Sequence, residues 1–199
     1  PYAREMLTFY NSFYKRGDDG RLEITPTQSL ETYWYDVMND TPTVAGLREC
    51  VDRLLKLPDG FASEKDTALW KSLDECLPAI PVGIVNGKEE FLPAEKYSDR
   101  RSNCENPTLY PIFPLHLCNL STDNLQIGIN SFYDRIEKRD NGWTQDGQQA
   151  ARLGLAEEAR KILLGKITYA NENFRFPAIW GPNFDWTPDQ DHGSNILMN

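Results

Sequence analysis

TQDGQQAARLGLAEEARKILLGKITYAN, residues 144–171, is the stretch that decides the fold class. It holds two runs of helix-forming residues, 144–153 and 155–172, with the single residue Gly154 between them. Two helices joined by so short a connection pack side by side in opposite directions. The stretch therefore predicts a helical hairpin.

Apolar residues at helical spacing continue upstream of this hairpin. In 44–57 one apolar stripe begins after Thr43, and the Pro-Asp-Gly at 58–60 ends it. The stretch 81–93 differs, because Asn86-Gly87 between two short apolar pieces predicts a β-hairpin. We therefore predict an all-α fold with one small β-hairpin decoration. Further helices are expected at 2–15, 63–77, 107–118 and 122–137.

Composition and motifs exclude several classes of function. The formal net charge is -9, whereas a nucleic-acid binder needs clustered Lys and Arg, so we expect no nucleic-acid partner. No apolar run approaches the roughly 20 residues that span a bilayer, so we expect no membrane partner. The four cysteines form no CxxC pair and only two histidines are present, so we expect no zinc cluster, other metal or cofactor. Cys50 and Cys76 fall on neighbouring predicted helices, so they could form a disulfide or remain as two free thiols.

The first candidate site is the stretch 25–36, TPTQSLETYWYD. Glu31 stands among aromatic residues, and a carboxyl group packed against aromatic faces loses hydration and becomes a usable general acid. Trp34 offers a flat apolar face for the C–H groups of a sugar ring. The alternative is a surface glutamate whose aromatic neighbours belong to the core.

The second candidate site is the stretch 180–193, WGPNFDWTPDQDHG. Three aspartates lie there among aromatic residues, and clustered carboxylates need compensation for their repulsion. Such a cluster fits a metal site with oxygen ligands, or a general base with acceptors for hydroxyl groups. The alternative is an acidic, solvated loop. The spacing of a calcium-binding loop is absent.

Four segments of the chain, in order, resemble one known family. They are TPTQSLETYW at 25–34, NPTLYPIFPLHLC at 106–118, GWTQDGQQAARLGLAEEA at 142–159 and TPDQDHGSN at 187–195. Together they resemble the C-terminal half of the (α/α)6-barrel domain of glycoside hydrolase family 95, the α-L-fucosidase-like six-hairpin enzymes. The resemblance departs at Leu30 and Thr32, where the family has Pro and Asn.

The resemblance implies an inverting glycosidase that removes a terminal, α-L-fucoside-like sugar from an oligosaccharide or glycan. Glu31 then protonates the glycosidic oxygen, and Asp191 activates a water molecule on the opposite face of the ring, with Asp189 as the reserve base. An inverting pair of carboxyl groups lies about 6.5–9.5 Å apart. The resemblance also implies a periplasmic or secreted protein. The residues expected to bind substrate are Trp34, Trp143, Trp180, Trp186, Asp189 and His192.

The resemblance further implies an incomplete domain. A six-hairpin toroid has about twelve helices, whereas we count about seven in the sequence. We therefore expect residues 1–199 to be the C-terminal portion of one catalytic domain, truncated at both ends. Such a chain is expected either to be inactive alone or to pair with the missing part or with a copy of itself. The alternatives are a carbohydrate-binding remnant without turnover and a helical interaction module.

Overall fold

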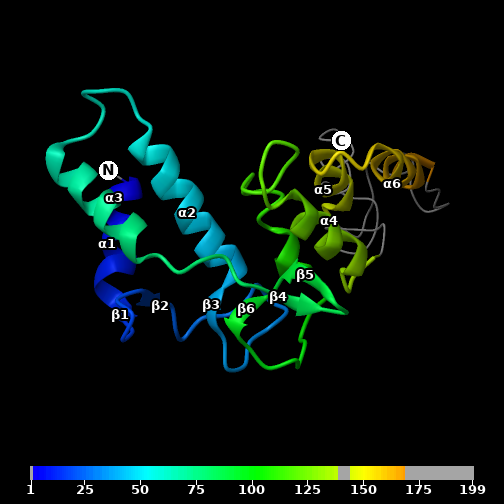
Figure 1. Ribbon diagram of the computed structural model, residues 1–199, viewed down its shortest axis with the longest axis horizontal. Coiled ribbons are helices and arrows are strands. Elements are labelled where there is room, and N and C mark those ends of the chain that lie inside the picture. Colours follow the sequence, from blue (N-terminus) through cyan, green and yellow to red (C-terminus); the bar gives the residue numbers. More distant parts are fainter. Residues whose placement is uncertain (1, 139–143, 169–199) are drawn as a thin grey trace, which may run out of the picture. The chain divides into compact units, whose positions relative to one another are not determined.

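The computed structural model describes residues 2–138 and 144–168, and these fall into two compact units that divide after Pro111 (Figure 1). In the first unit three helices, α1 (Tyr2–Phe13), α2 (Thr41–Leu55) and α3 (Glu64–Cys76), enclose a common core. The sequence predicted all three from their apolar spacing, and the structure confirms them. The buried core residues are Leu7, Leu22, Ile24, Val44, Leu47, Val51, Trp70, Leu73, Cys76 and Leu77.

Side-chain caps fix where two of these helices begin. The carboxylate of Asp40 accepts the backbone N–H of Thr43 at 2.9 Å and caps α2, and burial raises the pKa of that carboxyl group. Ser63 and Asp66 form a reciprocal capping box at the start of α3. The guanidinium of Arg4 on α1 binds the same Asp66 carboxylate, so one side chain both caps α3 and ties it to α1.

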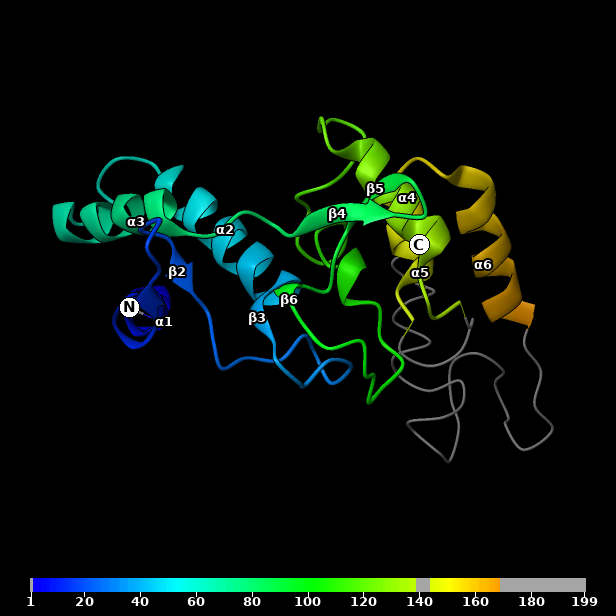
Figure 2. The same cartoon turned by 60° about the horizontal axis from the view of Figure 1, so that its bottom comes forward.

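Three two-stranded antiparallel sheets accompany the helices, as the turned view in Figure 2 helps to follow. The predicted hairpin is confirmed, because Asn86 and Gly87 have φ of 50° and 80° and join β4 to β5 in the left-handed conformation that such a turn needs. The other two sheets were not predicted. The pairs are β1 (Lys15–Arg16) with β2 (Leu22–Glu23), β3 (Met38–Asp40) with β6 (Ala94–Lys96), and β4 (Val82–Val85) with β5 (Lys88–Phe91).

The second unit contains α4 (Leu125–Asp134), α5 (Asp146–Arg152) and α6 (Ala156–Thr168). The predicted helical hairpin is confirmed as the pair α5 and α6, and Gly154 in the connection has φ of 74°, which favours glycine. On α4, Gly128 allows a close approach, because a Cβ atom there would overlap the sulfur of Cys118 and lie 2.9 Å from Leu153.

The prediction of an all-α fold that forms part of an (α/α)6 toroid is wrong, because the fold is mixed: six α-helices and three small antiparallel sheets lie within the described residues. The helix expected at 107–118 is also absent, and only a 3-10 turn, η1 (Pro107–Leu109), forms there. Pro111 and Pro114 lack the N–H groups that a helix needs, which explains why apolar spacing failed. Among the described residues no helix is long and apolar enough to cross a bilayer.

The thiols of the chain are free, so the disulfide alternative for Cys50 and Cys76 is excluded. Cys76 is buried in the first core and lies 3.5 Å from an Nη atom of Arg16. Cys118 is buried in the second unit, where the loss of hydration raises the pKa of its thiol to about 11.

Candidate functional site

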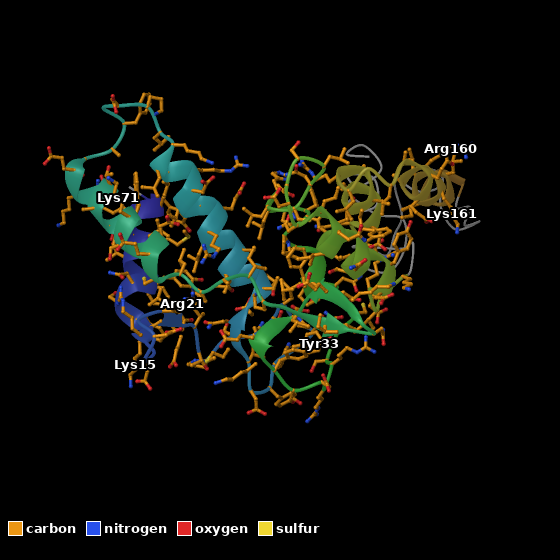
Figure 3. All side chains as sticks on the ribbon, in the orientation of Figure 1. Lys15, Arg21, Tyr33, Lys71, Arg160 and Lys161 are labelled. Atoms are coloured by element: carbon orange, nitrogen blue, oxygen red, sulfur yellow. The ribbon has the colours of Figure 1, made fainter. Side chains whose placement is uncertain are left out.

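The first candidate site is a tight turn in the first unit, residues 29–33, which we call the Glu31 turn. Ser29 and Tyr33 close it, since each donates its backbone N–H to the carbonyl of the other, at 2.9 and 3.2 Å. One side of the turn is buried. Ser29 donates its hydroxyl to the carbonyl of Pro93 at 2.7 Å. The ring of Tyr33, labelled in Figure 3, packs edge-on against that of Tyr97, with 5.3 Å between the ring centres. The turn is therefore anchored on one side and open on the other.

The crest of the turn carries the predicted acid. Leu30 has φ of 53°, a left-handed conformation that costs a non-glycine residue about 1–2 kcal/mol. It places Glu31 at an exposed position, directly followed by Thr32, which is 1% exposed. Such a conformation persists only where neighbouring contacts hold it in place.

Those contacts come from residues 102–105, far away in the sequence. The carboxylate of Glu105 accepts the backbone N–H of Glu31 at 2.9 Å and the hydroxyl of Thr32 at 3.2 Å. In return, the backbone N–H of Glu105 donates to the Thr32 hydroxyl at 3.2 Å, and that of Ser102 donates to the Thr32 carbonyl at 2.8 Å. Asn103 reaches the acid itself, donating its amide to Glu31 Oε2 at 2.9 Å. One segment thus holds both the backbone and the side chain of Glu31.

The three successive aromatic residues at 33–35 differ in burial. Tyr33 points into the unit, and its burial raises the pKa of the phenol. The next residue, Trp34, is 51% exposed, and its expected contact with a sugar ring stays a prediction. Tyr35 is partly exposed, and the guanidinium of Arg100 lies 4.5 Å from the centre of its ring. An exposed carboxylate and an exposed indole therefore stand three residues apart on one loop.

The environment of Glu31 differs from the one that the sequence led us to expect. Its side chain is exposed, so the expected loss of hydration against aromatic faces is wrong. The reason is the burial of its aromatic neighbours: Tyr33 is buried in the core, and Trp34 is exposed to solvent, so neither covers the Glu31 carboxylate. Its catalytic role stays a prediction.

The second candidate site lies outside the described residues. This applies to the predicted base Asp191, its reserve Asp189 and the remaining aromatic and histidine positions. The separation of the acid and the base therefore stays a prediction as well. The positions concerned are Trp143, Trp180, Trp186, Asp189, Asp191 and His192.

Polar residues at the start of α5 are buried. Asp146 is 1% exposed and binds the guanidinium of Arg135 at 2.5 Å, while Gln148 and Gln149 are each 3% exposed. Gln145 precedes the helix without a side-chain capping bond. Part of the interior of the second unit is therefore polar, beside apolar residues such as Phe132 and Leu153.

Sequence reasoning missed Glu105 and Asn103 as members of the site. The available signal was the polar run SNCEN at 102–106, which directly precedes the helix expected at 107–118. No family model and no curated protein matches the chain. The assignment of a function therefore depends on the residues of the site and on the resemblance described above.

Proposed function

We propose that the chain is part of a glycoside hydrolase in which Glu31 protonates the oxygen of the glycosidic bond. The observation that supports this best is the Glu31 turn. The turn is buried on one side and presents the Glu31 carboxylate on the other. The side-chain amide of Asn103 donates to that carboxylate at 2.9 Å, and the exposed indole of Trp34 is three residues away. A carboxylate with an amide suits sugar hydroxyl groups, and an indole face suits the C–H groups of the ring.

The proposed reaction needs two carboxyl groups. Glu31 in its acid form donates a proton to the glycosidic oxygen as the bond from that oxygen to the anomeric carbon breaks. Asp191, the expected base, takes a proton from the water molecule whose oxygen bonds to the anomeric carbon from the opposite face. The sugar leaves with inverted configuration, and the remainder of the glycan leaves as the alcohol. The family resemblance supports a terminal, α-L-fucoside-like glycone.

The exposure of Glu31 favours a second candidate, a module that binds carbohydrate without cleaving it. Carboxyl groups that act as acids in hydrolysis are commonly shielded from water by apolar neighbours. A hydrated carboxylate beside a tryptophan is sufficient for binding sugar hydroxyl groups. The two candidates make different predictions for the same pair of variants.

The test is turnover of a panel of 4-nitrophenyl glycosides, including the α-L-fucoside, by the chain and by its variants. For a hydrolase, Glu31→Gln lowers turnover about ten- to a hundredfold on these substrates, because general acid catalysis contributes about a hundredfold or more in full and less when the leaving group is as acidic as nitrophenol. Glu89→Gln, which changes an exposed glutamate on β5, is the matched control and leaves turnover unchanged. A chain that binds the free sugars in calorimetry but releases no nitrophenol is a binding module. A chain that binds none contradicts both candidates.

A further inference from the structure

We propose that Glu105 is a positioning residue for Glu31, one that holds the acid in place without touching the substrate. The inference depends on the proposed function of Glu31. Glu105 lies 74 positions further along the chain, and its carboxylate accepts hydrogen bonds from two successive residues of the turn, Glu31 and Thr32.

The geometry explains why the turn needs such a partner. Leu30 places the chain in the left-handed region immediately before Glu31, whose side chain is exposed. Glu105 binds the backbone N–H of Glu31 at 2.9 Å, so the peptide plane from which the acid projects is fixed.

The hydrogen bonds run in both directions. Thr32 donates its hydroxyl to the Glu105 carboxylate at 3.2 Å and accepts the Glu105 backbone N–H at the same distance. Thr32 is 1% exposed, so these bonds are partly buried. Asn103, two residues before Glu105, holds the side chain of the acid. Backbone and side chain of Glu31 are therefore both held by residues 103–105.

The position of the Glu105 acceptor oxygen, rather than its charge, is what the turn uses. That oxygen accepts both the backbone N–H of Glu31 and the hydroxyl of Thr32. Such positioning matters for an acid, because a displacement of about 1 Å in a reacting group can cost a hundredfold in rate.

The test uses Glu105→Ala and Glu105→Gln, assayed on whichever 4-nitrophenyl glycoside the unmodified chain cleaves. We expect Glu105→Ala to lower kcat at least about tenfold while KM changes by less than about threefold, since the bound substrate is not touched. Glu105→Gln keeps a carbonyl oxygen for both donors, so we expect it to restore kcat to within about threefold. If Glu105→Ala does not fold, Glu105→Asp replaces it, because its shorter carboxylate cannot reach both donors.

The matched control is Glu95→Ala on β6, which removes a carboxylate that accepts the amide of Asn39 at 2.7 Å, outside the Glu31 turn. It should lower the midpoint of thermal unfolding and leave kcat unchanged. An unchanged kcat in Glu105→Ala, or a raised KM with unchanged kcat, would overturn the positioning role. So would a loss that glutamine does not restore. If the unmodified chain cleaves no glycoside, the proposed function itself fails, and this inference fails with it.

Discussion

The ion pair between Arg135 and Asp146 in the second unit should contribute to the free energy of unfolding. The size of that contribution depends on how deeply the pair is buried. The two side chains are 10% and 2% exposed, and Nε of Arg135 lies 2.5 Å from Oδ2 of Asp146. An exposed ion pair contributes about 0–1 kcal/mol. Removing one partner of a buried pair costs about 3–5 kcal/mol, because the other charge stays buried without its counter-ion. Because both side chains are nearly buried, the cost of removing one of them should be that of a buried ion pair.

We therefore predict that Asp146→Ala lowers the free energy of unfolding by about 3–5 kcal/mol. Arg135→Ala should cost at least as much, because its guanidinium also donates to the carbonyl of Phe132 at 2.6 Å and lies 4.0 Å from the centre of that ring. The double variant should cost clearly less than the sum, since neither charge is left buried. We expect a coupling energy above about 1 kcal/mol.

The assay is urea unfolding of the four proteins of this cycle, followed by circular dichroism. Lys56 and Asp52 on α2 provide the control cycle, because their side chains are 71% and 48% exposed and their pairing should contribute less than about 1 kcal/mol. A cost below about 1 kcal/mol for Asp146→Ala, or additive single effects, would refute the reasoning.

Three further predictions follow from the contacts of single residues. Arg4 holds the pKa of Asp66 well below its usual range, so the stability that this carboxylate contributes is present above its unfolded pKa of about 3.9 and is lost as the pH falls below it. Asp66→Asn should therefore flatten the fall in the thermal midpoint below about pH 4. Gly128→Ala should cost about 1–3 kcal/mol in urea unfolding, because the added methyl group overlaps the sulfur of Cys118, and Cys118→Ala in the same chain should recover part of that loss. Iodoacetamide at pH 8 should label the exposed Cys104 long before Cys118, as mass spectrometry of peptides would show.

Each of these three has an outcome that contradicts it. An equally steep acid transition in Asp66→Asn would show that other carboxylates set the acid limit. A Gly128→Ala variant as stable as the unmodified chain would mean that the Cys118 side chain moves aside without cost. Early labelling of Cys118 would mean that the second unit opens more readily than its burial indicates.

The predictable part of the fold depends on local signals. The apolar stripe of α2 and the Asn86-Gly87 turn are each formed by residues that are close in the sequence, so the sequence was sufficient for these elements. Strand β3 has three residues, too few for a periodic pattern, and its partner β6 lies more than fifty positions away. Apolar spacing misled at 107–118, where prolines prevent a helix.

In the candidate site, too, some features were predictable from local sequence and others were not. Glu31 and Trp34 were predictable from residue type, and the structure places them on one loop. The direction of each side chain was not, because it depends on which face of the turn the rest of the unit buries. Glu105 was missed because a contact that joins residues 74 positions apart leaves no local pattern.

The leaving-group dependence of turnover tests most directly whether Glu31 is the acid. A general acid matters most when the leaving alcohol is poorly acidic, and little when it leaves readily without a proton. We predict that Glu31→Gln loses at least about a hundredfold in turnover of 4-methoxyphenyl glycosides and less than about tenfold on the 2,4-dinitrophenyl glycosides of the same sugar. An equal loss on both substrates, or no loss on either, would contradict the assignment of Glu31 as the acid.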